Sequence, residues 1–177
     1  MEQGRKMENN KKVLYVDMDN VIVDFKTGIE RVPKFVMEAH VASAGLDDNG
    51  EPKDLDDIPG IFSLMEPMKD AVESVLDLAR VFDLYLLSSS PWNNPSAWSD
   101  KIRWVHLHFG NSKQNPIYKR LILSHHKNLN DGHFLVDDRL KSGAELFGQK
   151  AGSEHIHFGQ GEHKDWKQVH PYLMDRA

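Results

Sequence analysis

Residues 13–25 read VLYVDMDNVIVDF, and this stretch decides the fold. The run from Val13 to Val16 is typical of a strand that is buried on both faces of a parallel sheet. Two acids, Asp17 and Asp19, follow it directly. Burying an unpaired carboxylate is costly, whereas the carboxyl ends of strands in an open α/β sheet form the crevice where ligands bind. The stretch therefore predicts a strand that carries acids to a ligand-binding edge; the alternative is an exposed acidic turn.

Two later predicted strands also end in polar side chains. The strand at 84–87 (LYLL) leads into a serine run, and the strand at 133–136 (HFLV) leads into a pair of acids. These polar residues are Ser88, Ser89, Ser90, Asp137 and Asp138. Parallel strands end at the same edge of a sheet, so we expect all of them to share one pocket with Asp17 and Asp19. Four carboxylates there would repel one another without a cation, and their hard oxygen ligands fit Mg²⁺.

Strands alternate with helical periodicity along most of the chain. Helices are predicted at 68–81 and at 97–109, where Trp98, Ile102, Val105 and Phe109 lie on one side. This alternation predicts an α/β fold with a Rossmann-like, mostly parallel sheet and flanking helices. Residues 25–62 interrupt the alternation, and we place a small inserted helical cap there. The core domain would then comprise residues 13–24 and 63–177, after a polar N-terminal tail at 1–12.

The composition excludes several classes of protein. The chain has no cysteine, which rules out disulfides, thiolate catalysis and cysteine-based metal sites. A net charge of −5 disfavours a nucleic-acid polymer as partner. Among the ten histidines, His155 and His157 share a face of a predicted strand, but no third zinc ligand is evident nearby. No apolar run is long enough to span a membrane, and the polar tail lacks a secretory leader, so we expect no membrane association and a cytoplasmic location.

Four segments, in order, share a pattern with one superfamily. They are Asp17-Met18-Asp19-Asn20-Val21 with its extension Val23-Asp24-Phe25, then Leu86-Leu87-Ser88, then Lys127, and finally Leu135-Val136-Asp137-Asp138-Arg139. They resemble the motifs of haloacid dehalogenase-type (HAD) phosphohydrolases, in particular of the 5′(3′)-deoxyribonucleotidase family. The segment 61–67 also resembles that family, and the likeness runs from about residue 12 to residue 158. Asn20 departs from the pattern, because many members have glycine there.

The resemblance implies Mg²⁺-dependent hydrolysis of a phosphomonoester. Asp17 would attack phosphorus and form an aspartyl-phosphate. Asp19 would protonate the leaving oxygen and later deprotonate the attacking water. Asp17, Asp19 (through its backbone carbonyl) and Asp138 would hold the metal, with Asp137 supporting or replacing Asp138.

The resemblance also implies how the phosphate is bound. Ser88 would donate a hydrogen bond to a phosphoryl oxygen, although the long serine run leaves Ser89 as an alternative. Lys127 would supply positive charge. Two histidines precede this lysine, so Lys119 or Lys141 could take its place.

The substrate implied is a deoxyribonucleoside monophosphate. Phe25 and Phe62, and as a third candidate Trp92, could stack on the base or pack against the sugar. Each could equally be an ordinary core aromatic residue. Two alternatives stay open: a HAD phosphatase for another small metabolite such as a sugar phosphate, and a catalytically inactive member that only binds. Retention of all the motif acids favours an enzyme.

Overall fold

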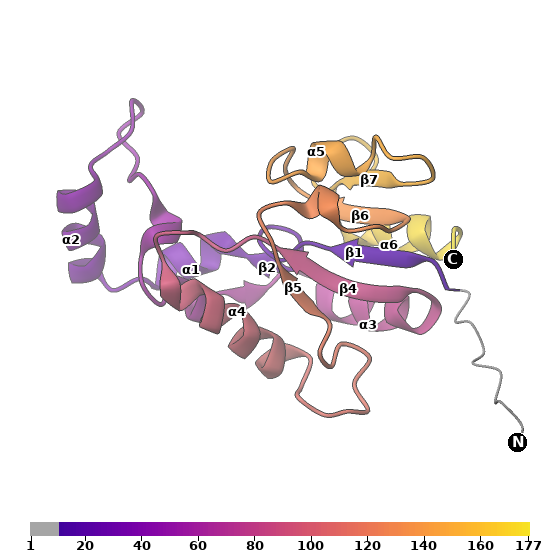
Figure 1. Ribbon diagram of the computed structural model, residues 1–177. Coiled ribbons are helices and arrows are strands. Elements are labelled where there is room, and N and C mark those ends of the chain that lie inside the picture. Colours follow the sequence, from indigo (N-terminus) through magenta and orange to yellow (C-terminus); the bar gives the residue numbers. More distant parts are fainter. Residues whose placement is uncertain (1–10) are drawn as a thin grey trace, which may run out of the picture.

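The structure is a computed structural model and describes residues 11–177 (Figure 1). Its main sheet has five parallel strands in the order β5-β4-β1-β6-β7. These strands are β1 (Val13–Val16), β4 (Asp83–Ser88), β5 (Leu121–Leu123), β6 (Phe134–Asp137) and β7 (Glu154–His157). The strand order reverses at β1, which lies between β4 and β6, and ligands bind at such a reversal in open α/β sheets. The prediction of an α/β fold with a mostly parallel sheet is confirmed.

Helices connect these strands and cover the sheet. The helices are α1 (Phe25–Arg31), α2 (Lys34–Ala44), α3 (Ala71–Val81), α4 (Pro95–His108), α5 (Ala144–Phe147) and α6 (Trp166–Met174). Single 3-10 turns lie at η1 (Leu55–Asp57), η2 (Ile61–Leu64) and η3 (Lys127–Leu129). None of the helices described between residues 11 and 177 is both long and apolar enough to cross a membrane.

The core lies on both faces of the sheet, because side chains alternate along each strand. Leu14 and Val16 of β1 point into the larger cluster, which includes residues of α3 and α6. Tyr15 points the other way and packs against Phe147 of α5, with the two rings edge to face. This double burial explains the unbroken apolar run of β1 and fixes the position at which the chain leaves the sheet.

The segment between β2 (Val23–Asp24) and β3 (Glu66–Pro67) leaves the core and returns to it. The two short strands pair antiparallel, which brings the start and the end of the segment together. Helix α2 extends away from the sheet (Figure 1), and none of its residues is fully buried. The later part of the segment is tied to the core by Asn94, whose Nδ2 donates to the carbonyl oxygens of Asp56 and Ile58 at 2.8 and 3.0 Å.

Helix α4 buries only part of the side that its apolar pattern predicts: Val105, and Phe109 just after the helix, are buried at 3% and 6% exposed. Trp98 and Ile102 are 36% and 37% exposed, whereas Lys101 is only 1% exposed. The buried side also contains Ala97, Trp104 and Val105. An apolar pattern treats lysine as a solvent-exposed residue, so it places Lys101 outside the buried side of the helix. In the structure Lys101 is buried because it finds polar partners in the core.

The predicted tail, residues 1–12, lies outside the described residues except for its last two positions. The carbonyl oxygen of Lys12 accepts a hydrogen bond of 3.0 Å from the backbone N–H of Asp83. Lys12 therefore extends the contact between β1 and β4 by one residue.

Candidate active site

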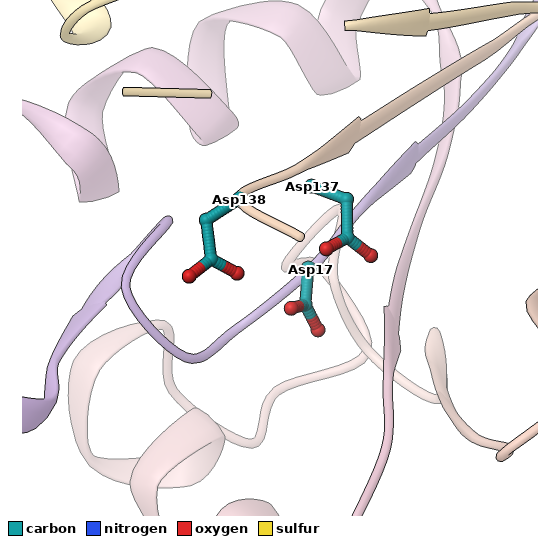
Figure 2. A group of neighbouring side chains, drawn as sticks. All are labelled: Asp17, Asp137 and Asp138. Atoms are coloured by element: carbon teal, nitrogen blue, oxygen red, sulfur yellow. The ribbon is translucent and has the colours of Figure 1, made fainter. Parts of the chain in front are cut away.

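Three carboxylates meet where β1 and β6 end. Asp17 directly follows β1, Asp137 is the last residue of β6, and Asp138 comes next. Figure 2 shows their side chains converging, and each offers an oxygen within 4.8 Å of those of the other two. The ladder continues past β1 through a 2.9 Å hydrogen bond from the N–H of Asp17 to the carbonyl of Val136, which holds the two strand ends in register.

Lys127 is the cation that packs against these acids. Its Nζ lies 2.9 Å from Oδ1 of Asp17 and donates a hydrogen bond to Oδ2 of Asp137. All three side chains are almost completely buried. The two alternative lysines lie elsewhere: Lys119 lines a separate cavity beside Tyr118, and Lys141 is exposed.

Several carboxylate oxygens at this site lack hydrogen-bond partners among residues 11–177. They are Oδ1 and Oδ2 of Asp17 and Oδ1 of Asp138, all of which are buried. The contact between Lys127 and Asp17 is therefore a close ion pair without hydrogen-bond geometry. Buried polar atoms are normally satisfied, and a set of hard oxygen donors with free lone pairs suits a divalent cation such as Mg²⁺.

The pKa values of these three acids are shifted in different directions. Burial raises the pKa of Asp17, but the positive charges of Lys127 and Lys101 outweigh it, so the net pKa is lowered. Burial and the charge of Asp17 raise the pKa of Asp137 to about 7, against the opposing effect of Lys127. Burial and Asp17 also raise the pKa of Asp138. Asp17 is therefore the most readily ionised acid of the three.

Asp19 belongs to a second buried group, which the sequence analysis did not predict. Nζ of Lys101 donates to both carboxylate oxygens of Asp19, at 2.8 and 2.6 Å. The same Nζ lies 3.1 Å from Oγ of Ser88, the last residue of β4. Burial raises the pKa of Asp19, and the charge of Lys101 offsets part of that rise. Lys101 thus connects the carboxylate of Asp19 with the hydroxyl of Ser88.

A cavity of about 550 Å³ opens next to this group. Asp19, Asn20 and Ser89 line it on the side of the strand ends, and Phe25, Phe62 and Trp92 supply aromatic surface. The remaining lining residues are Pro52, Asp54, Leu55, Asp56, Ser90, Pro91, His125 and Arg139. The cavity therefore lies between the strand ends and the segment that leaves the core.

The aromatic residues of the cavity differ in how much of each side chain is exposed. Phe62 is 2% exposed and belongs to the core, while Trp92 is 80% exposed. Phe25 is half-buried and packs edge to face on Phe62, with ring centroids 5.9 Å apart. Trp92 lies edge to face with His125 at 6.0 Å. Phe25 therefore presents a fixed aromatic surface, and Trp92 lies at the rim.

Sequence reasoning missed Lys101, and it placed Ser90 in the shared pocket without giving it a role of its own. Ser90 is 1% exposed, lines the cavity, and its Oγ has no hydrogen-bond partner among the described residues. The serine run gave a signal for Ser90, because the whole run follows a predicted strand. Only a weak sequence signal pointed to Lys101, which is a single lysine in a predicted amphipathic helix.

Comparisons with known proteins agree with this geometry. Residues 11–174 match the family described as "5′ nucleotidase, deoxy (Pyrimidine), cytosolic type C protein". A protein of Vibrio phage KVP40 (isolate Vibrio parahaemolyticus/Japan/Matsuzaki/1991), described as "Putative 5′(3′)-deoxyribonucleotidase", is 44% identical over 170 residues, which cover 96% of this chain and 89% of that protein.

A solved structure shows the same fold. The magnesium-bound "putative HAD-hydrolase YfnB from Bacillus subtilis" superimposes with a TM-score of 0.55 at 12% identity, covering 92% of this chain and 98% of that one. The likeness to this structure concerns the fold alone. The family match, by contrast, spans nearly all of the described residues. The chain therefore belongs to the cytosolic type C family of deoxy (pyrimidine) 5′-nucleotidases, and it is a phosphatase with the fold of the HAD hydrolases.

Proposed function

We propose that this phosphatase hydrolyses deoxyribonucleoside monophosphates in a Mg²⁺-dependent reaction that passes through an aspartyl-phosphate on Asp17. The observation that carries the proposal is the state of Asp17: it is buried at the central strand end, its pKa is lowered, and neither carboxylate oxygen accepts a hydrogen bond from the described residues. An ionised carboxylate with free lone pairs is a competent nucleophile.

Asp19 is the proposed acid and base of the two half-reactions. Its raised pKa favours the protonated form, which the departing sugar oxygen needs, and it lines the cavity. After the ester bond breaks, the ionised Asp19 would remove a proton from the water that attacks the aspartyl-phosphate. Lys101 would hold Asp19 in place through both transfers, because it contacts both carboxylate oxygens.

The donor set fits Mg²⁺, with Asp17, Asp138 and the backbone carbonyl of Asp19 as proposed ligands. Asp137 takes the supporting role in this proposal, because its Oδ2 accepts a hydrogen bond from Lys127 and its Oδ1 accepts one of 3.0 Å from the N–H of Arg139. The ion would supply positive charge that lowers the repulsion between the phosphate and the nucleophile. The magnesium in the B. subtilis HAD structure supports this choice of metal.

The phosphate would be held by groups at the end of β4 and at the start of η3. The hydroxyl of Ser88 lies beside Lys101, and Ser89 lines the cavity, so both serines remain proposed phosphate contacts. Lys127 contacts Asp17 directly. Its positive charge would stabilise the negative charge that builds up on the phosphoryl group in the transition state.

Residues 25–62 are the proposed cap, which selects the leaving group. They contribute Phe25, Pro52, Leu55 and Phe62 to the cavity, and also Asp54 and Asp56, so one part of the wall is apolar and aromatic and another part is acidic. A base stacks on the aromatic part of such a surface, whereas a sugar phosphate has no aromatic ring to stack. The names of the family and of the phage relative also support a deoxynucleotide substrate.

A phosphate-release screen tests the proposal. The substrates are deoxy- and ribonucleoside 5′- and 3′-monophosphates and common sugar phosphates, each with Mg²⁺ and with chelator. We expect deoxynucleotides to be cleaved fastest, only with Mg²⁺, and not at all by Asp17→Asn, which keeps the volume and removes the charge. Near-normal turnover by Asp17→Asn would exclude the covalent mechanism, and faster cleavage of sugar phosphates would exclude the nucleotide assignment.

A further inference from the structure

Asp138 differs from the other two acids of the site, because no strand fixes it. The N–H of Asp17 bonds to the carbonyl of Val136 in β6, and Asp137 pairs with His157 of β7, but Asp138 is the first residue beyond β6. The orientation of its carboxylate therefore depends on contacts made by other parts of the chain. Among the described residues, two hydrogen bonds hold Asp138, one to its carboxylate and one to its main-chain carbonyl, and their donors lie far apart in the sequence.

The first contact comes from Asn20, in the turn after β1. Its Nδ2 donates to Oδ2 of Asp138 at 3.2 Å. Because one carboxylate oxygen is held in this way, the other, Oδ1, is left buried without a hydrogen-bond partner among the described residues; Nε of Arg139 lies 3.6 Å from it. Asn20 thus determines which oxygen of Asp138 stays free.

The second contact comes from His157, at the end of β7. Its Nε2 lies 2.9 Å from the backbone carbonyl oxygen of Asp138. A carbonyl oxygen can only accept, so Nε2 carries the hydrogen and donates it. In the parallel register of β6 and β7, His157 pairs with Asp137, which places the imidazole beside the residue that follows the strand.

We propose that Asn20 and His157 are positioning residues that clamp Asp138, one by its side chain and one by its main chain, and so set the affinity of the site for Mg²⁺. The inference rests on the proposed function, because it assigns Asp138 to the metal. Groups that orient a metal ligand commonly change metal affinity or activity by about ten- to a hundredfold when removed.

The backbone conformation of Asn20 provides a sharp test. Its φ is +56°, a left-handed conformation that glycine adopts freely and that asparagine tolerates. If Asn20 only formed the turn, Asn20→Gly would leave metal binding unchanged and relax the backbone. If it positions Asp138, the same change weakens Mg²⁺ binding although the turn is preserved. Lys119→Gly is the matched control, because Lys119 also has a positive φ, +59°, and lines a separate cavity.

For His157 the test compares two variants. His157→Gln keeps an N–H donor, whereas His157→Leu removes it. We expect His157→Leu to weaken Mg²⁺ binding and His157→Gln to restore most of the affinity. Equal weakening in both would mean that the imidazole acts by packing and would overturn its assignment.

Metal affinity is measured on the whole chain without substrate, by calorimetric titration with Mg²⁺ and by electron paramagnetic resonance with Mn²⁺. We expect Asn20→Gly and His157→Leu each to raise the dissociation constant on the order of tenfold. The maximal rate at saturating Mg²⁺ should change much less. If the wild-type protein binds metal and hydrolyses phosphomonoesters, but Asn20→Gly binds metal with the same affinity, this inference alone is wrong. If wild-type protein does neither, the proposed function fails with it.

Discussion

Nζ of Lys101 lies 2.8 and 2.6 Å from the two carboxylate oxygens of Asp19, although the residues are 82 positions apart in the chain. The lysine is 1% exposed and reaches the acid from the inner side of α4. A buried cation placed against a buried acid holds the acid still and counteracts the rise in pKa that burial causes. The acid/base chemistry that we assign to Asp19 therefore depends on a residue of a distant helix.

Lys101→Met should reduce kcat/KM on the order of a hundredfold, the scale of losing one preorganised charged donor. It should also move the limb of the pH–rate profile that reports Asp19 to higher pH, because the charge that lowers its pKa is gone. Steady-state kinetics between pH 5 and pH 9 check both effects.

Lys113→Met is the control for this change, because Lys113 is an exposed lysine in the loop that follows α4. An unchanged pH profile in Lys101→Met would show that the lysine does not tune Asp19. Loss of a buried partner can also destabilise the fold, since an unpaired buried charge is costly. Thermal unfolding of both variants is therefore measured alongside the kinetics.

Asp19→Asn should impair poor leaving groups more than good ones. A nucleoside leaves through a strongly basic oxygen, which needs a proton, whereas the weakly basic aryloxide of an activated aryl phosphate leaves with little help from an acid. We expect formation of the phospho-enzyme from the aryl phosphate to be retained in large part, and its hydrolysis to be slow because the water has lost its base. Rapid-quench measurement of the phospho-enzyme distinguishes the two steps. Equal loss of the first step with both substrates would argue against Asp19 as the acid.

Stabilisation by Mg²⁺ should increase as the pH rises through 7. Burial raises the pKa of Asp137 to about 7 in the folded protein, against about 4 for an ordinary aspartate. A carboxyl group with a raised folded pKa contributes stability that is lost as the pH rises from about 4 to about 7. Mg²⁺ bound beside Asp137 opposes this protonation through its positive charge, so the ion binds more weakly below pH 7 than above it.

Thermal unfolding with Mg²⁺ and with chelator, at pH 6 and pH 8, checks this expectation. The rise in Tm on adding Mg²⁺ should be larger at pH 8. Asp17 does not interfere, because its pKa is lowered from a value that is already below this range. Asp137→Asn should reduce the difference between the two pH values, and an equal Mg²⁺ effect at both in the wild-type chain would contradict the expectation.

The sheet and its acidic edge could be predicted from the sequence because their signals are local. The run Val13 to Val16 needs only its own residues to indicate a doubly buried strand, and Asp17 follows it at once. Asp137 gave the same kind of signal at the end of β6. The parallel arrangement then brings these strand ends together, as the 4.8 Å cluster shows.

Lys101, Asn20 and His157 could not be assigned in this way, because their partners are distant in sequence. Lys101 reads as a solvated residue until the fold brings Asp19 to it. The asparagine at position 20 was visible as a departure from glycine, but its contact with Asp138 is 118 residues away. His157 was weighed as a zinc ligand; in the structure its Nε2 instead contacts the carbonyl of Asp138. Local sequence patterns predict helices and strands and where they end. Contacts between side chains of different helices and strands can be identified only once the three-dimensional fold is known.

Phe25→Ala should lower catalytic efficiency on a deoxynucleotide by roughly ten- to a hundredfold, because stacking a base on an aromatic ring contributes about 1–3 kcal/mol. Phe25 is the first residue of α1 and lines the cavity, and its ring is braced edge to face against Phe62. A small alkyl phosphate cannot use the ring, so its hydrolysis should change little and serves as the internal control. Phe25→Leu separates the effects, because it keeps an apolar wall and removes the π-face. Equal losses on the nucleotide and the alkyl phosphate would mean that Phe25 supports the fold of the site rather than the base.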